Sequence, residues 1–345
     1  MTQIPNWKKL RNGKLDWSVF QLRSKVLRVV REYFGEQNYM EIEAPLLTPF
    51  PTLDNHIESI HCDVETTGGR SHRLYLHTSP EHAMKKLLSA GSGSIYFLGK
   101  VFRDNETTRL HNSEFTMAEW YRIQADYHDI MHDTRTLICR IADRCFNSHI
   151  FRYQNTEIDL TPSWPVVSVS ELFNSTYGLS PSELLSKESL KRTAEKYAIH
   201  TAPDDDWETL FHRLFLANIE PGLGIPQPVF VIDYPDKIGL MARHKSGDSG
   251  FVERVELYIA GLELANGYSE LTDPEEQLHR FEQQKKRRKA CEYYNDPVDR
   301  ELIEAMKLGM PACAGIALGV DRLIMLFLNR SEIQDVILFP WHHME

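Results

Sequence analysis

Two apolar and aromatic runs, separated by a polar stretch, constrain the fold of this 345-residue chain more than any other feature. The runs are residues 95–103 and 114–122, and the polar stretch is 104–113. Such runs are typical of β-strands, so we expect an antiparallel hairpin with a long loop. Because side chains alternate along a strand, one face of the second strand carries Phe115, Met117, Glu119 and Tyr121.

The N-terminal third predicts further elements around this hairpin. Residues 16–37 carry apolar side chains at helical spacing and predict an amphipathic helix, and residues 39–43 alternate as in a strand. Ser79-Pro80-Glu81 has the composition of a helix start, with Ser79 as the N-cap and Pro80 in the first turn. Glu81 would then lie at a helix N-terminus.

A second hairpin is expected within residues 251–265. With its turn centred between Ile259 and Ala260, Glu256 and Glu263 would face each other across the two strands. Like charges in directly opposed positions are destabilising unless a cation lies between them. The two glutamates are therefore candidates for a cation site.

The rest of the chain predicts one helical insertion and one strand–helix junction. Residues 166–209 have the pattern of short amphipathic helices joined by Ser, Pro and Gly turns. We expect a single catalytic domain over residues 1–345, with a helical insertion at about 166–225. The small-residue strand 315–319 leads into an apolar helix and places Arg322 in its first turn.

Composition excludes several classes of protein. A net charge of -10 argues against broad binding to nucleic-acid phosphates. No stretch approaches the ~20 apolar residues of a membrane span, and the first residues lack the apolar core of a secretory signal, so we expect a cytoplasmic protein. The basic run 285–289 lies in a polar segment, 274–293, that predicts an exposed helix.

Three motifs in order give the chain a family resemblance. One segment resembles motif 2 of the class II aminoacyl-tRNA synthetases through Phe102-Arg103, His111, Glu114-Phe115-Thr116 and Glu119-x-Tyr121. Tyr33-Phe34 through Pro45 is similar to motif 1, and Gly315-x-Ala317-x-Gly319-x-Asp321-Arg322 to motif 3. The run Glu263-Leu264-Ala265-Asn266-Gly267-Tyr268-Ser269-Glu270-Leu271 resembles the lysyl enzymes in particular. The resemblance implies an α+β fold, an antiparallel sheet flanked by helices, and a homodimer formed through motif 1.

The resemblance also implies an ATP-dependent, AMP-forming ligase. Arg103 and Arg322 are the expected catalytic residues, because nucleotidyl transfer needs cations at the developing negative charge. Phe115 would stack on adenine, and His111 would reach the phosphates. The expected ATP-binding residues are Arg103, Asn105, His111, Asn112, Phe115, Glu263, Leu264, Gly319 and Arg322. Glu256 and Glu263 are expected to hold Mg²⁺ on the phosphates.

For the amino acid, the resemblance implies recognition of lysine or β-lysine. Glu119, Tyr121 and Glu270 would hold the side-chain ammonium, and Glu81 would lie near the other amine. The expected amino-acid-binding residues are Ser79, Glu81, Glu119, Tyr121, Asn266, Glu270 and Ala317.

The sequence departs from the lysyl-tRNA synthetase pattern in three places. Those enzymes carry an N-terminal anticodon-binding barrel, whereas motif 1 begins here near residue 16, so we expect no such barrel. Asn105 stands at a glutamate position of motif 2. Ala317 stands at a glycine position of motif 3, where a methyl group would crowd the amine of the substrate.

These departures resemble a branch of the family whose members attach β-lysine to a lysine of translation elongation factor P. We therefore expect elongation factor P, and not tRNA, to be the acceptor. Two alternatives remain open. One is a truncated lysyl-type enzyme that charges tRNA, and the other is a non-catalytic paralogue with a regulatory role.

Overall fold

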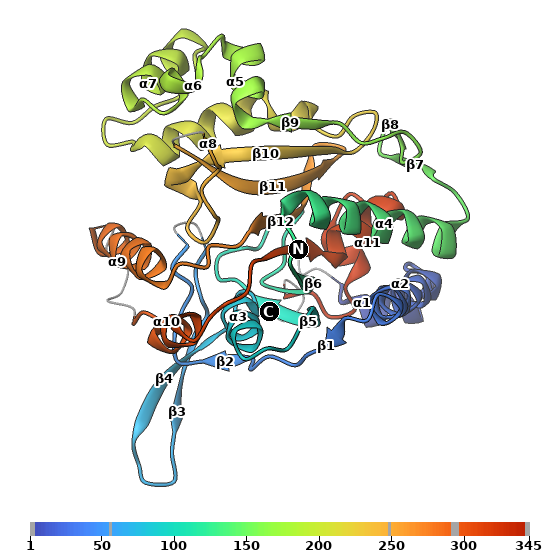
Figure 1. Ribbon diagram of the computed structural model, residues 1–345. Coiled ribbons are helices and arrows are strands. Elements are labelled where there is room, and N and C mark those ends of the chain that lie inside the picture. Colours follow the sequence, from blue (N-terminus) through green and yellow to red (C-terminus); the bar gives the residue numbers. More distant parts are fainter. Residues whose placement is uncertain (1–3, 55–56, 248–249, 291–296, 342–345) are drawn as a thin grey trace.

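The predicted hairpin lies within an eight-stranded sheet, as Figure 1 shows. The computed structural model describes residues 4–54, 57–247, 250–290 and 297–341, and in this part the strand order is β1-β5-β6-β13-β12-β11-β10-β9. The strands are β1 (Met40–Glu41), β5 (Ile95–Phe102), β6 (Glu114–Ile123), β9 (Val166–Ser168), β10 (Val229–Pro235), β11 (Phe251–Ile259), β12 (Leu262–Ser269) and β13 (Cys313–Gly319). Neighbours are antiparallel except β1–β5 and β9–β10. The predicted α+β fold is confirmed.

Helices cover both faces of this sheet. On one face lie α2 (Trp17–Glu36), α4 (Tyr127–Phe146) and α11 (Val320–Phe327), and on the other lie α3 (Glu81–Ser89), α9 (Pro274–Ala290) and α10 (Arg300–Lys307). Along β6, Ala118 and Trp120 pack toward the first group, whereas Met117 and Tyr121 pack toward the second. The predicted alternation along this strand is confirmed, and it aims Glu119 at the second face.

Asp321, at the start of α11, joins three segments that are distant in the sequence. The side chain is 1% exposed. It accepts a hydrogen bond from the Thr116 backbone N–H of β6 at 2.8 Å and pairs with Arg23 of α2. Arg23 also donates to the Thr116 hydroxyl at 2.6 Å. The segments that resemble the three motifs are therefore held together by one buried carboxylate.

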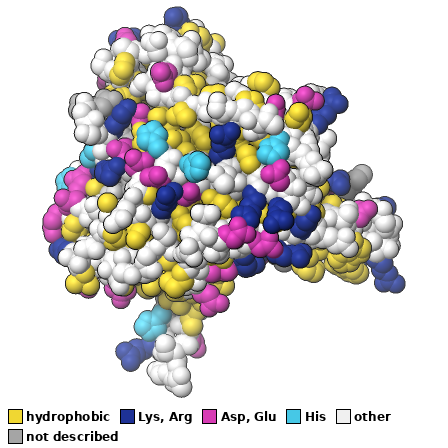
Figure 2. All heavy atoms as spheres, turned by 45° about the vertical axis from the view of Figure 1, so that its right-hand side comes forward, with side chains coloured by type: hydrophobic (Ala, Val, Ile, Leu, Met, Phe, Trp, Pro, Cys, Tyr) yellow, Lys and Arg dark blue, Asp and Glu magenta, His cyan; other side chains and the backbone are white. Residues whose placement is uncertain are grey.

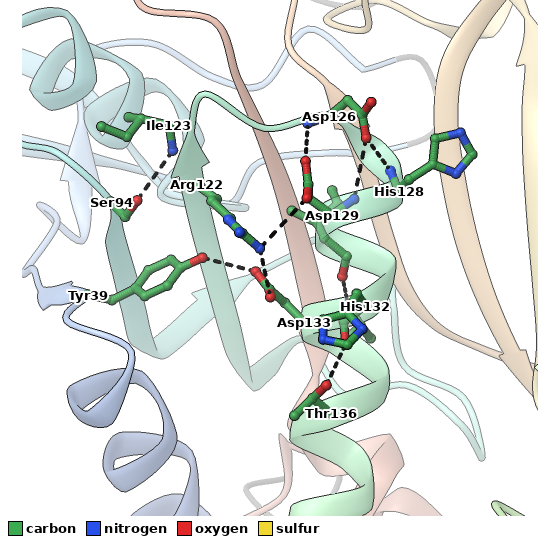
Figure 3. A network of polar contacts seen from close by, with 12 residues as sticks. Tyr39, Ser94, Arg122, Ile123, Asp126, His128, Asp129, His132, Asp133 and Thr136 are labelled. Carbon is green, nitrogen blue, oxygen red and sulfur yellow. Dashed lines mark hydrogen bonds and ion pairs between the residues drawn. The ribbon is translucent and has the colours of Figure 1, made fainter. Parts of the chain in front are cut away.

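A second polar network fixes α4 against β6 and the end of α2 (Figure 3). Asp126 caps α4 in a reciprocal capping box with Asp129. Asp133 accepts hydrogen bonds from Arg122 at 3.2 Å and from the Tyr39 hydroxyl at 3.0 Å. Burial raises the pKa of the Asp133 carboxyl and of the Tyr39 phenol. This arrangement anchors β6, the strand that carries Glu119.

The hairpin of β11 and β12 is confirmed, but its predicted register is wrong. Glu256 pairs with Asn266, and Glu263 pairs with Tyr258. The turn residues Ala260 and Gly261 both have left-handed backbones, with φ 55 and 74, and a bulge follows beside Tyr258. The turn and the bulge together shift the pairing, so the two glutamates are not directly opposed.

Short helices occur in the predicted insertion. They are α5 (Val169–Tyr177), α6 (Pro181–Leu184), α7 (Lys187–Lys196), α8 (Trp207–Asn218) and η1 (Glu220–Gly222). They share a separate apolar cluster with β10 and β11, in which Phe173 stacks on Phe211 with centroids 5.1 Å apart. The first residues of the segment are β9, a strand of the main sheet. None of the helices in the described ranges is long and apolar enough to cross a membrane.

Two predictions at helices need correction. We expected Ser79 to be the N-cap of α3. The helix begins at Glu81 with Pro80 as its N-cap, so Ser79 lies one position before the cap. Helix α9 is not simply exposed, because its buried residues are Gln277, Phe281, Gln284 and Arg288. Arg288 binds the Ile57 carbonyl oxygen at 3.4 Å, which ties the basic run to a neighbouring loop. The expected end of this helix, residues 291–293, lies outside the described residues.

The remaining elements are peripheral to the main sheet. They are α1 (Asn6–Arg11), the three-stranded sheet β2 (Leu47–Thr48), β4 (Ser71–Leu76) and β3 (His61–Glu65), the pair β7 (Ile150–Tyr153) and β8 (Thr156–Asp159), η2 (Asp236–Ile238) and η3 (Ile333–Val336). The β3–β4 hairpin projects from the body in Figure 1.

On the face shown in Figure 2, Lys and Arg side chains lie beside Asp and Glu side chains and do not form a broad basic surface.

Candidate active site

A cavity of about 1250 Å³ lies over the face of the sheet that carries Glu119. Strands β6, β12 and β13 supply its floor, and α3 and α9 contribute to its walls. Most of the predicted site residues line this one cavity, so the structure brings together segments from all three motifs. The predicted residues that do not line it are Asn105, Glu256 and Glu270.

Arg103 and Phe115 form a cation–aromatic pair at one end of the cavity. The guanidinium carbon of Arg103 is 5.2 Å from the centroid of the Phe115 ring. Glu106 pairs with Arg103 at 3.4 Å, while the buried Arg103 Nε has no hydrogen-bond partner among the described residues. An arginine with a free N–H and an aromatic face beside it can hold a phosphate and a purine ring together.

Arg322 is held in place by three acceptors. It donates to the Glu263 carbonyl oxygen at 2.8 Å, to the Leu110 carbonyl oxygen at 3.4 Å, and to Nε2 of His111. Burial and the nearby Arg322 charge lower the pKa of His111 to about 4. A neutral His111 accepts from Arg322 and donates from Nδ1 to the Thr108 hydroxyl, 2.8 Å away. His111 thus orients the arginine.

The two asparagines of the predicted nucleotide site have other partners. Asn105 has a left-handed backbone, with φ 57, and its amide donates to Glu58 at 3.3 Å, away from the cavity. Asn112 touches the cavity, but its side chain donates to the Glu114 carbonyl oxygen and accepts from the Trp341 N–H. Both side chains are engaged in holding loops.

Glu256 is surrounded by donors from its own chain. One oxygen accepts from Arg254 at 2.6 Å and from Asn266 at 3.4 Å, and the other accepts from Tyr234 at 2.5 Å and Tyr258 at 2.6 Å. These contacts fill the hydrogen-bonding positions of a carboxylate. Sequence reasoning missed Arg254, although its two-residue spacing from Glu256 on a strand places both on one face.

Glu263 fits a magnesium ion better than Glu256 does. It lines the cavity, and burial together with the neighbouring Glu256 raises the pKa of its carboxyl to about 7. A cation beside it would favour the ionised form. No group of three or more His, Cys, Asp or Glu within the described ranges is arranged to hold a metal. Magnesium would therefore take most of its ligands from phosphates and water, with Glu256 contributing only by releasing a donor.

Glu119 forms the floor at the opposite end of the cavity. Its oxygens accept hydrogen bonds from the Ser79 hydroxyl at 2.8 Å and the Tyr121 hydroxyl at 2.9 Å. Ser79 also accepts from the Glu81 N–H at 3.0 Å, so one hydroxyl fixes both carboxylate-bearing segments. Burial and the charge of Glu81 raise the pKa of Glu119 to about 7. A ligand ammonium would relieve this cost.

Lys85 is the residue that sequence reasoning missed in this region. The side chain is fully buried, and its ammonium lies 2.7 Å from Glu81 and 2.5 Å from Glu270. Burial raises the pKa of Glu270 to about 8, although Lys85 opposes the rise. The four-residue spacing of Glu81 and Lys85 on a helix was a signal for their pairing.

Ala317 lies in the floor between two predicted substrate residues. On β13 it is paired with Asn266 of β12 and with Glu119 of β6, and its methyl group lines the cavity. Any added side-chain volume at this point would therefore enter the cavity. The neighbouring Gly315 also lines the cavity beside Glu270.

Comparison with known proteins agrees with this arrangement. The sequence model of the class II tRNA synthetases (D, K and N) matches residues 6–343. The chain belongs to this family. Like its motifs, the match extends over both ends of the cavity.

Similar class II proteins include ligases with a protein substrate in their names. The elongation factor P–(R)-β-lysine ligase of Vibrio cholerae is 38% identical over 335 residues, which are 94% of this chain and 98% of that protein. The ligase of the same name from Photorhabdus laumondii is 37% identical, with 92% and 93% covered. The lysine–tRNA ligase of Pelotomaculum thermopropionicum is 36% identical, with 93% of this chain but 63% of that protein covered.

Gly315→Ala tests the packing of this class II floor. A Cβ at this position would lie 2.3 Å from a Tyr121 ring carbon and 2.9 Å from Glu270 Oε1. We expect a loss of about 1–3 kcal/mol in the free energy of unfolding, because the added methyl group would overpack the floor. Denaturant unfolding measures it. Gly319→Ala is the control, because its nearest contact would be 3.7 Å, and equal losses in both variants would contradict the account.

Proposed function

We propose that the protein activates (R)-β-lysine with ATP as an aminoacyl adenylate and transfers the β-lysyl group to a lysine ε-amine of elongation factor P. The observation that carries the proposal is the similarity to the Vibrio cholerae ligase over nearly the whole of both chains. The cavity supports it, because Arg103 and Arg322 line one end with Phe115, and Glu81 and Glu119 line the other. Anions and ammonium groups of an adenylate match these ends.

In the first step, the substrate carboxylate attacks the α-phosphate of ATP, and pyrophosphate leaves. Arg103 neutralises charge at the α-phosphate and orients the carboxylate, while Phe115 stacks on adenine. Arg322, oriented by His111, clamps the nucleotide. Proximity and preorganised charge supply most of the rate in such a reaction. Mg²⁺, held mainly by Glu263, would add positive charge at the phosphates when bound.

In the second step, the neutral ε-amine of the acceptor lysine attacks the carbonyl carbon of the adenylate. An amide forms, AMP leaves, and the attacking amine loses a proton. The mixed anhydride is reactive enough that no covalent intermediate on the protein is needed.

The proposal includes the domain organisation and the oligomeric state of the protein. We propose a single catalytic domain over residues 1–345 that works in the cytoplasm as a homodimer, with the α2–β1 segment at the twofold interface. Symmetric dimers are the commonest oligomers.

The similarity to a lysine–tRNA ligase favours tRNA charging as the second candidate function. We do not propose a regulatory paralogue, because Arg103, Glu263 and Arg322 all face the cavity.

The proposed function is tested by supplying both amino acids and both acceptors. Pyrophosphate exchange is measured with α-lysine and with (R)-β-lysine, followed by mass spectrometry of elongation factor P and acid precipitation of tRNA. We expect faster exchange with β-lysine and a mass increase of one β-lysyl group on elongation factor P. Charging of tRNA with α-lysine, without modification of the protein, would favour the second candidate.

Arg103→Ala tests the nucleotide end. Loss of a preorganised cation at the α-phosphate should lower the rate of pyrophosphate exchange by about 10²- to 10³-fold. Exchange kinetics with saturating β-lysine measure the effect, and Arg109→Ala, a neighbouring arginine outside the proposed site, is the control. A near-normal rate in Arg103→Ala would contradict the assignment.

The amino-acid end should depend on pH. The pKa values of about 7 for Glu119 and about 8 for Glu270 mean that both carboxyls gain protons as the pH falls from 8.5 to 6. Only the ionised forms attract ammonium groups, so affinity for lysine or β-lysine should fall about tenfold or more over this range. Calorimetry without ATP measures it, and proton release on binding is expected at pH 7. A constant affinity would contradict these ionisation states.

Ala317→Gly tests the choice between lysine isomers. Ala317 lines the cavity between Asn266 and Glu119, and we expect its methyl group to obstruct the α-amine of α-lysine more than the β-amine of β-lysine. One methylene in a tight pocket is worth about 1–3 kcal/mol in discrimination. We therefore expect kcat/KM for α-lysine to improve about tenfold relative to β-lysine, with KM for ATP unchanged. An unaltered ratio would show that Ala317 does not set the preference.

A further inference from the structure

Lys85 is a charged residue beside the amino-acid end of the cavity, and its side chain has no exposed surface. It is 0% exposed and does not line the cavity. A buried ammonium is costly unless it is paired, and the pairing here is with two carboxylates, at 2.7 Å to Glu81 and 2.5 Å to Glu270. The lysine therefore joins the first turn of α3 to the residue that follows β12.

The titratable groups around Lys85 come from four elements. Besides Glu81 on α3 and Glu270 after β12, the Tyr268 ring of β12 lies 6.0 Å from the ammonium. Glu119 of β6 and Cys313 of β13 are close enough to interact with its charge. Lys85 is the cation that these groups share.

The pairing leaves one Glu270 oxygen for a ligand. Lys85 binds Oε2, and the buried Oε1 has no hydrogen-bond partner among the described residues. A Cβ built on Gly315, which lines the cavity, would lie 2.9 Å from this Oε1. The free oxygen therefore lies beside Gly315, a lining residue that has no side chain. Glu81 similarly gives Oε1 to Lys85 while its side chain lines the cavity.

We propose that Lys85 is a positioning residue that orients Glu81 and Glu270 and sets the charge of the pocket to match an amino acid with two ammonium groups. Three carboxylates, Glu81, Glu119 and Glu270, surround one lysine, so the ionised pocket has two net negative charges. A diamino acid brings two positive charges to this end. The inference rests on the proposed function, because it takes such an amino acid as the substrate.

Lys85→Met tests this role, because it removes the charge and nearly keeps the shape. Without the cation, the carboxylates repel one another more strongly, so their pKa values rise further and a smaller fraction of them is ionised at pH 7. We expect KM for β-lysine to rise about tenfold or more at pH 7, with kcat within about threefold and KM for ATP within about twofold of wild type. At pH 9 the defect in KM should shrink to about threefold as the carboxyls ionise.

Lys86→Met is the matched control. Lys86 is the next residue on α3, and it pairs with Asp299 at 2.9 Å and Glu301 at 3.2 Å, outside the carboxylate cluster. We expect KM for β-lysine to be unchanged in this variant. An unchanged KM in Lys85→Met, or a fall in kcat and melting temperature alone, would mean that Lys85 is merely structural and would overturn the proposal.

Chemical rescue keeps the test decisive if Lys85→Met does not fold. In Lys85→Ala, added ethylamine should lower KM for β-lysine at least about fivefold, whereas ethanol or NaCl at the same concentration should not. Absence of rescue would overturn the proposal. If the wild-type protein shows no exchange with either lysine isomer, the proposed function fails. If the wild-type protein shows exchange and Lys85→Met has an unchanged KM for β-lysine, only the proposal for Lys85 fails.

Discussion

The buried Asp321 carboxylate and its two partners hold the elements of the site in position. The carboxylate ties α11 to the Thr116 backbone of β6 and to Arg23 of α2. A carboxylate that is 1% exposed is stable only when its oxygens are occupied, so the three segments are held in one arrangement. One residue further along α11, Arg322 reaches the cavity. The positions of Arg322 and of the floor strand are therefore set by the same contact.

The other end of the cavity depends on buried negative charge. Glu119 is held by two hydroxyls, and Glu81 and Glu270 are held by Lys85. Burial raises the pKa of Glu119 and Glu270 because the ionised forms are poorly solvated. An arriving ammonium offsets this cost, whereas a neutral or anionic side chain does not. In the proposed function, specificity for a cationic amino acid would follow from electrostatics before any detail of shape, and Ala317 would add the shape.

Local patterns were enough to predict much of the fold. The period of two along β6 and the polar loop before it predicted the first hairpin, and apolar spacing predicted α2, because these signals depend on near neighbours in the sequence. The register of β11 with β12 could not be predicted, since Ala260 adopts a left-handed backbone that the sequence does not mark.

The site was predictable where a motif fixed both the residue and its direction. Arg103, Phe115 and Glu119 line the cavity as expected. Asn105 does not, because its backbone conformation turns the side chain toward Glu58. Lys85 was missed: the helical spacing from Glu81 is a signal for their pairing, but the burial of Lys85 depends on Glu270, which belongs to a distant strand end. The donors around Glu256 are likewise brought together only by the folded sheet.

A crystal structure with a sulfamoyl analogue of β-lysyl adenylate would show whether the two ends of the cavity bind the nucleotide and the amino acid as proposed. We expect the adenine ring to stack on Phe115, the sulfamoyl group to lie beside Arg103, and the far ammonium to lie within about 3.2 Å of Glu119 and of Glu270 Oε1. We also expect the Lys85 contacts to persist. A far ammonium bound elsewhere, with Glu119 contacting only Ser79 and Tyr121, would contradict the proposal.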